Sequence, residues 1–148
     1  MTRAHVHSEE FPVSPDRLFA ILTQPSAIRS WWSASRAIVV PAKGGTWAAA
    51  WGEDEDDPDY VTVATLSEFE PPKRLVLSDY RYHAKSGGLP FDADFVTSFE
   101  VEATPDGARL RVTQDGFPDG PEADGFLQGC TQGWVDTFAG IRSHLAPD

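Results

Sequence analysis

The C-terminal part of the chain carries the pattern that most restricts the fold. From residue 127 to residue 145, apolar side chains recur at intervals of three and four residues, which is the spacing of one face of an α-helix. At 100° per residue they fall within an arc of roughly 80°. Region 121–145 is therefore predicted to be one long helix whose apolar stripe is gripped by a sheet. The stripe consists of Leu127, Cys130, Trp134, Phe138, Ile141 and Leu145.

Glycines on the other side of this predicted helix need an explanation. Gly129, Gly133 and Gly140 fall roughly opposite the apolar stripe. Each costs about 1 kcal/mol relative to Ala in a helix interior. Two interpretations stay open: the grip of the sheet alone holds the helix in place, or the glycines allow another segment or subunit to approach closely.

The rest of the chain is predicted to form strands and two short helices. Ser14 and Pro15 are suited to the cap and the first position of one helix, and Pro25 to the start of a second. These helices follow a first strand and precede six more. The order indicates an α+β fold with a meandering antiparallel sheet, in a single domain over residues 1–148. Strands are expected at 4–11, 35–40, 45–51, 60–70, 74–82, 94–104 and 108–116.

One hairpin can be predicted residue by residue. Apolar and polar side chains alternate on both sides of the turn TPDG, residues 104–107. Pairing Glu102 with Arg109 places opposite charges side by side on the outside, and the same register sets Phe99 against Val112 on the inside. Pro-Asp-Gly turns often carry a bulge that would shift this register by one residue. We expect the apolar pattern to decide the register.

Charge and hydropathy exclude several classes of protein. The net charge is -11, so phosphate backbones and anionic lipid surfaces would repel the chain, and neither nucleic acid nor a membrane is an expected partner. No stretch approaches the ~18 apolar residues of a transmembrane helix, and the N-terminus lacks the apolar run of a signal peptide. Cys130 is the single cysteine, which excludes an internal disulfide. A cytoplasmic location is therefore expected.

A search for metal, cofactor and catalytic motifs gives no candidate. The acidic segment EDEDDPD (53–59) lacks the glycine and the closing Glu of a calcium loop, so a solvated hairpin tip is predicted. His5 and His7 share a strand face without further ligands at metal-binding spacing, which favours a structural role over zinc. No phosphate-binding, dinucleotide-binding or nucleophile-elbow motif occurs. No metal and no cofactor are expected, and no catalytic residue is assigned.

Five motifs, from about Phe11 to Leu145, are typical of one known superfamily. They are SPDRLFAILTQPSAIRSWW (14–32), GGTW (44–47), EFEPPKRLVLS (68–78), DGARLRVTQDGFP (106–118) and GWVDTFAGIRSHL (133–145). With these motifs the chain resembles START/Bet v 1-like (SRPBCC) proteins, and specifically the branch similar to the C-terminal domain of the Hsp90 ATPase activator Aha1. The resemblance implies a helix-grip fold. In this fold a curved antiparallel sheet of about seven strands wraps the long C-terminal helix, and a cavity lies between them.

The resemblance also implies a function based on the cavity. Members of the superfamily are known as carriers of hydrophobic ligands, as polyketide cyclases and aromatases, and as co-chaperone domains. We predict binding of a small hydrophobic or aromatic molecule. The alternatives are a cyclase or aromatase-type enzyme that uses the same pocket, and a chaperone-interacting module. Hsp90 is not an expected partner of this chain alone, because the resemblance covers only the C-terminal-type domain, and a homodimer stays open.

The predicted ligand site contains most of the tryptophans. Trp31 and Trp32 flank one side of a short helix, and one of them is predicted to pack inward while the other lies at the rim of the cavity. The alternative is that both are ordinary packing residues. Residues predicted to line the cavity are Trp32, Trp47, Tyr80, Tyr82, Phe99, Trp134 and Phe138.

The direction of the side chains in strand 74–82 is left open by the sequence. Residues two apart on a strand share a face. Either Asp79 and Arg81 face the cavity together with Leu77, or the phenols of Tyr80 and Tyr82 do. Either set would supply the few polar groups that orient a ligand in an apolar pocket.

Overall fold

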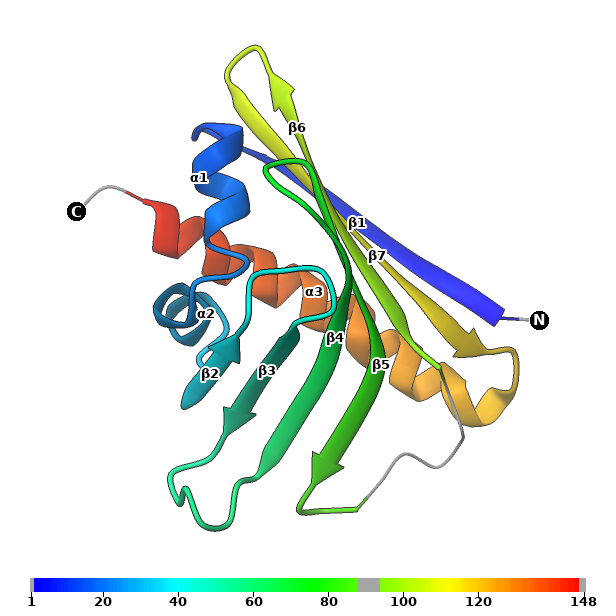
Figure 1. The fold of residues 1–148 in the computed structure, drawn as a ribbon. Helices are drawn as coiled ribbons and strands as arrows, with labels where there is room; N and C mark the ends of the chain where they lie inside the picture. The colour runs from blue at the N-terminus through cyan, green and yellow to red at the C-terminus, as the bar shows by residue number, and fades with distance from the viewer. Residues whose placement is uncertain (1, 88–93, 147–148) are drawn as a thin grey trace.

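The described residues form one curved sheet and a long helix, with two short helices near the start. The computed structural model describes residues 2–87 and 94–146. Its strands are β1 (Thr2–Phe11), β2 (Arg36–Val39), β3 (Thr46–Trp51), β4 (Tyr60–Glu70), β5 (Arg74–Ala84), β6 (Val96–Thr104) and β7 (Gly107–Pro118). Within the described part of the chain they make one seven-stranded antiparallel sheet, in the order β1-β7-β6-β5-β4-β3-β2. The predicted α+β helix-grip fold is confirmed (Figure 1).

Two short helices follow β1, as the sequence predicts. They are α1 (Pro15–Ala20) and α2 (Pro25–Trp31). The Ser14 hydroxyl accepts a hydrogen bond from the backbone N–H of Arg17 at 3.2 Å, which caps α1. Each helix begins with a proline, whose missing N–H costs nothing in the first turn.

The long helix α3 (Asp124–Leu145) lies against the concave face of the sheet (Figure 1). It follows a single 3-10 turn, η1 (Pro121–Ala123), so the predicted helical region holds except for that first turn. The predicted apolar stripe is buried only from Trp134 onward, and Leu127 and Cys130 are partly exposed. The C-terminal half of α3 is therefore packed in the core, whereas the N-terminal half is not.

The tightly packed core lies at the end of the molecule that contains α1, α2 and the C-terminal half of α3. Leu18 of α1 and Ile28 of α2 have no exposed surface. Phe138 and Ile141 of α3 are equally inaccessible, as is Leu110 of β7. Helix α2 contacts both α3 and β2, and α1 contacts β6 and β7. Helix α2 thus covers the C-terminal half of α3, and α1 packs against the sheet at the same end.

The predicted β6–β7 hairpin is confirmed with its register. Phe99 lies opposite Val112 and Glu102 lies opposite Arg109. The Arg109 guanidinium donates to the Glu102 carboxylate at 2.9 Å. The turn after Thr104 introduces no shift in the register. The apolar pattern outweighs the tendency of Pro-Asp-Gly to form a bulge, because a shift of one residue would turn every buried side chain outward.

The first strand forms one edge of the sheet, where it pairs with the seventh. Strands β1 and β7 lie side by side (Figure 1), with Phe11 opposite Ala108 and Thr2 opposite Pro118 at the other end of β1. At the opposite side of the sheet, the acidic segment 53–59 lies in the turn between β3 and β4, as predicted. Lys85 forms ion pairs with Asp57 and Asp59 at that turn. No described helix is both long and apolar enough to cross a membrane.

Candidate ligand-binding site

A cavity of about 720 Å³ lies between the sheet and the N-terminal half of α3. Side chains from the end of α2 and from β3 to β7 line one side, and α3 lines the other. The volume is in the range of small-molecule sites in proteins. Aromatic side chains make up nearly half of the lining residues: Trp31, Trp32, Trp47, Tyr80, Tyr82, Phe95, Phe99, Phe126 and Trp134.

Trp32 is the centre of a cluster of four indoles at one end of this cavity. Its ring contacts the rings of Trp31, Trp47 and Trp51, with centroid distances of 5.5, 5.5 and 5.0 Å. Trp31 is buried, whereas Trp32 is partly exposed. One tryptophan of the pair therefore packs inward and the other lies on the cavity surface, although the ring of Trp31 also contributes to the lining.

Two of these indoles also hold the segment that directly follows α1. Buried backbone carbonyls outside a helix or sheet need hydrogen-bond donors from elsewhere. The indole N–H of Trp31 donates to the carbonyl of Ile21 at 3.0 Å. That of Trp47 donates to the carbonyl of Leu22 at 3.1 Å. The rings are therefore held in fixed positions by hydrogen bonds as well as by packing.

Trp32 differs from the other tryptophans in its hydrogen bonding. The Trp51 N–H donates to the Trp32 carbonyl at 3.1 Å, and the Trp134 N–H donates to Gln114 at 2.7 Å. The indole N–H of Trp32 has no acceptor among residues 2–87 and 94–146. It is a donor left free on the cavity surface.

A bulge in β5 settles which side chains face the cavity. The β4–β5 register shifts between Val63 and Thr65, and Asp79 has a φ of 54°. This irregular residue breaks the alternation of the strand, because an extra residue reverses the faces beyond it. Leu77, Tyr80 and Tyr82 therefore all line the cavity, while Asp79 and Arg81 are exposed. The two sets proposed from the sequence were not true alternatives, since both assumed an unbroken strand.

Tyr80 and Thr97 place two bonded hydroxyl groups on the cavity wall. The Tyr80 hydroxyl donates to Thr97 Oγ1 at 2.9 Å, and the Thr97 side chain is buried, with 2% of its surface exposed. Burial raises the pKa of Tyr80 to about 12, although the hydrogen bond to Thr97 lowers it in part. Both hydroxyls are therefore neutral at physiological pH.

A second polar group joins β7 to α3. The Gln114 side-chain oxygen accepts from the indole of Trp134, and its amide lies beside the thiol of Cys130. Burial raises the pKa of Cys130 to about 11, although the hydrogen bond from Gln114 lowers it in part. The thiol is therefore protonated at physiological pH and is a poor nucleophile.

Glycines give α3 a bare surface on the cavity side. Gly125, Gly129 and Gly133 line the cavity at intervals of four residues, and a Cβ at any of them would meet no atom within 4 Å. Gly140 differs, because a Cβ there would overlap the carbonyl oxygen of Trp31 in α2. Close approach of another segment thus explains Gly140 alone. The other three glycines leave space open.

Six of the seven side chains predicted for the site line the cavity. Tyr82 lies at its mouth, with 47% of its surface exposed and its ring stacked on Tyr60. Phe138 does not line the cavity. It lies one turn beyond Trp134, where α2 and β1 cover α3, and it packs against His7 and Phe11.

Several cavity residues were absent from the prediction made on the sequence. Aromatic character was a usable signal for Phe95 and Phe126, whose rings contact each other and Phe117. No sequence signal marked Thr97 or Gln114, because strand residues of this kind are common on solvent-exposed faces. Phe91 lies outside the described residues.

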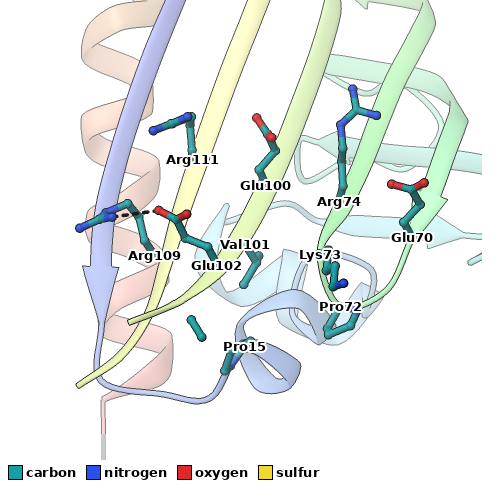
Figure 2. Close-up of a pocket in the computed structure, with 11 residues that line it drawn as sticks. Pro15, Glu70, Pro72, Lys73, Arg74, Glu100, Val101, Glu102, Arg109 and Arg111 are labelled. Carbon is teal, nitrogen blue, oxygen red and sulfur yellow. Dashed lines mark hydrogen bonds and ion pairs between the residues drawn. The ribbon is translucent and has the colours of Figure 1, made fainter. Parts of the chain in front are cut away.

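A second hollow, of about 580 Å³, lies on the outer face of the sheet beside α1 (Figure 2). Its lining is dominated by charged side chains from the ends of β5, β6 and β7. Arg109 is paired with Glu102, and Arg74 is paired with Glu68 at 2.5 Å. Exposed pairs of this kind contribute little to binding or stability. The charged residues of this groove are Glu70, Lys73, Arg74, Glu100, Glu102, Arg109 and Arg111.

The described residues contain no candidate metal centre. Within residues 2–87 and 94–146, no three His, Cys, Asp or Glu side chains are grouped so as to hold a metal ion. His5 and His7 stack on each other at 6.5 Å, and His7 is hydrogen-bonded to Glu9 at 2.7 Å. They join β1 to α3, away from the cavity lining.

Comparison with known proteins gives one family match. The family model described as "Activator of Hsp90 ATPase homolog 1-like protein" matches residues 12–146. No curated protein matches the sequence.

Solved structures resemble this one over nearly the whole chain. Protein MLL2253 from Mesorhizobium loti is 26% identical, with a TM-score of 0.77 and coverage of 97% of this chain and 96% of that one. CV1439 from Chromobacterium violaceum is 18% identical, with a TM-score of 0.73 and coverage of 98% and 99%. CalU16 from Micromonospora echinospora is 15% identical, with a TM-score of 0.69 and coverage of 99% and 78%. At these identities, CV1439 and CalU16 show only that they share the fold of this chain.

Proposed function

The chain belongs to the family of activator of Hsp90 ATPase homolog 1-like proteins, within the START/Bet v 1-like superfamily, and we propose that it binds a small hydrophobic or aromatic molecule. The proposed site is the cavity between the sheet and the N-terminal half of α3. The observation that carries the proposal is the combination of an aromatic lining with a glycine face that leaves space unfilled. An apolar molecule in this space would replace poorly held water and contact the ring faces of Trp32 and Trp47.

The ionisable groups in the cavity support binding more than catalysis. A general acid or base works best when its pKa lies near the operating pH. The pKa of Tyr80 is raised to about 12 and that of Cys130 to about 11, which is far from neutral in both cases. No histidine is among the described residues that line the cavity. A cyclase or aromatase-type enzyme would need a different proton carrier, and the carboxylate of Asp136 is the one remaining candidate among the described lining residues.

Filling the cavity from α3 gives a direct test. In Gly129→Leu the new side chain has room to enter the cavity, since a Cβ there meets no neighbour within 4 Å. Gln128→Leu is the matched control, because it adds the same side chain at an exposed position one residue earlier. Intrinsic tryptophan fluorescence and melting temperature would be measured with a panel of sterols, fatty acids, flavonoids and aromatic polyketides.

We expect at least one compound to quench or shift the fluorescence saturably and to raise the melting temperature. Binding to the folded state alone stabilises it by about 2.7 kcal/mol at a ligand concentration of 100 times Kd. Gly129→Leu should lose both responses while Gln128→Leu keeps them. A panel without any response, or an unchanged response in Gly129→Leu, would contradict the proposal.

The two alternative functions predict different outcomes. A cyclase or aromatase-type enzyme would convert a compound of the panel, which mass spectrometry of the incubated mixture would detect. A chaperone-interacting module would raise the ATPase rate of Hsp90 saturably on titration. We expect neither change with this chain.

A further inference from the structure

The polar groups of the cavity restrict the chemistry of the ligand. We infer that the ligand is an uncharged aromatic molecule with a carbonyl-type oxygen, which accepts a hydrogen bond from the Tyr80–Thr97 hydroxyl pair. This inference rests on the proposed function, since it names the class of molecule that the same cavity takes.

One hydroxyl hydrogen of the Tyr80–Thr97 pair makes no hydrogen bond within the pair. Tyr80 and Thr97 each carry one hydroxyl hydrogen, and the single hydrogen bond between them, at 2.9 Å, occupies only one of the two. Neither hydroxyl has another partner among the described residues. A buried donor without an acceptor costs free energy, and a ligand oxygen placed beside the pair would remove that cost. The pair therefore provides one donor for an acceptor atom.

Charge in the cavity argues against an anionic ligand. No Lys, Arg or His occurs among the described lining residues, and the only carboxylate there is that of Asp136. A carboxylate that left water for this cavity would lose its hydration without gaining a counter-ion. Fatty acids and other carboxylates are therefore disfavoured as ligands. The oxygen of a ketone or quinone carries no net charge and needs no counter-ion, so it suits this cavity.

The shape of the cavity favours a flat ring system. Gly125, Gly129 and Gly133 expose the backbone of α3 in one row over two helical turns, while Phe126, Cys130 and Trp134 form the neighbouring row of the lining. Trp32 and Trp47 present aromatic rings to the same cavity. Flat aromatic molecules gain both from a smooth surface and from offset or edge contacts with indoles. A flexible acyl chain would gain less, because it would lose more conformational freedom on binding.

Three molecules with one ring skeleton separate these properties. Fluorene is the hydrocarbon, 9-fluorenone adds a carbonyl oxygen, and fluorene-9-carboxylate adds a negative charge at pH 7. We expect 9-fluorenone to bind about three- to tenfold more tightly than fluorene, which is the usual effect of one neutral hydrogen bond. The carboxylate should bind more weakly than fluorene. Tryptophan quenching gives the three affinities, and melting temperatures check them.

Variants then locate the donor. Tyr80→Phe and Thr97→Val each leave one hydroxyl proton, so each single variant should keep part of the preference for 9-fluorenone. The double variant should bind fluorene and 9-fluorenone equally. Thr62→Val, which removes another hydroxyl of the cavity lining, should keep the whole preference. Trp32→Phe removes the free indole N–H. If the preference for 9-fluorenone disappears in this variant, the donor is Trp32 and not the Tyr80–Thr97 pair, which overturns the assignment.

A spectroscopic measurement keeps the test independent of how stable the double variant is. The carbonyl stretch of 9-fluorenone bound to the unmodified chain should lie at a lower wavenumber than in a hydrocarbon solvent, because a donated hydrogen bond weakens the C=O bond. An unshifted band, or equal binding of 9-fluorenone and fluorene, would overturn the inference while leaving the proposed function intact. Failure of all three compounds to bind would overturn the inference, and failure of the broader panel as well would overturn the proposed function.

Discussion

Both halves of α3 contain glycine, but the glycines have opposite structural roles in the two halves. In the C-terminal half, Gly140 allows the backbone of α2 to lie so close that no side chain would fit between them. In the N-terminal half, Gly125, Gly129 and Gly133 face open space in the cavity. Both kinds of glycine carry the same cost in helix propensity, about 1 kcal/mol relative to Ala. The difference shows that glycine in a helix can serve close packing or the absence of packing.

The large side chains of the two halves also differ in how completely they are packed. Phe138 has no exposed surface and packs against His7 and Phe11. Trp134 contacts Phe99 on one side and borders the cavity on the other. The packed half should therefore determine stability, and the open half should determine ligand affinity.

The largest expected effect is the loss of a side chain from the packed half. Phe138→Ala should lower the free energy of unfolding by about 3–5 kcal/mol, because it leaves a cavity in a close-packed core. Trp134→Ala should cost less, since part of its surface already faces open space. Urea unfolding of both variants would measure the difference. A greater loss in Trp134→Ala would contradict the division of α3 into a packed and an open half.

A smaller loss is expected when a methyl group is added at the packed glycine. Gly140→Ala should lower the free energy of unfolding by about 1–3 kcal/mol, because the new Cβ overlaps the carbonyl oxygen of Trp31 and forces α2 to shift. Thermal and urea unfolding would report it. Equal stability of Gly140→Ala and the unmodified chain would show that α2 moves away freely.

A pH dependence of stability is expected from Tyr80 of β5, which lines the cavity beside the open half of α3. The pKa of Tyr80 is raised to about 12 in the folded chain, against about 10 in an unfolded one. Between these values the folded state holds a proton that the unfolded state has lost, so the free energy of unfolding falls as the pH rises from 10 to 12. Below pH 10 this contribution is fully present.

Tyr80→Phe should flatten that decline, which urea unfolding at pH 9 and pH 11.5 would reveal. Tyr60→Phe is the control, because Tyr60 is exposed and lies outside the cavity lining. A decline as steep in Tyr80→Phe as in the control would mean that Tyr80 ionises as readily in the folded chain as in the unfolded one.

The smallest expected effect has the opposite sign. Gly129→Ala should raise the free energy of unfolding by up to about 1 kcal/mol, because the new methyl group has free space and alanine favours the helix. The same variant should bind ligand more weakly than the unmodified chain. Circular dichroism melts and tryptophan quenching would measure the two changes. Destabilisation by Gly129→Ala would contradict the conclusion that Gly129, unlike Gly140, faces open space.

The elements that the sequence predicts best are those with an unbroken period. The stripe on α3 follows a helical repeat, and the β6–β7 register follows from alternation that pairs Phe99 with Val112. The turns that begin α1 and α2 follow from Ser14 and from two prolines. These signals are local, so neighbouring residues are enough to identify them.

Features that interrupt a period could not be predicted in the same way. The irregular residue Asp79 reverses the faces of β5, and nothing in its neighbours marks it as the bulge. The roles of Gly129 and Gly140 depend on what lies opposite them in space. The placement of Phe138 outside the cavity depends likewise on where α2 covers α3. Long-range contacts of this kind leave no periodic trace in the sequence.

The pairing of β1 with β7 has a consequence for how the chain is made. Thr2 lies opposite Pro118, so β1 has no neighbour in the sheet until the seventh strand has left the ribosome. Contacts between residues so distant in sequence also slow folding. During synthesis β1 and the aromatic residues of the unfinished sheet stay uncovered, and surfaces of this kind favour aggregation. The nascent chain is thus expected to depend on chaperones more than the finished protein does.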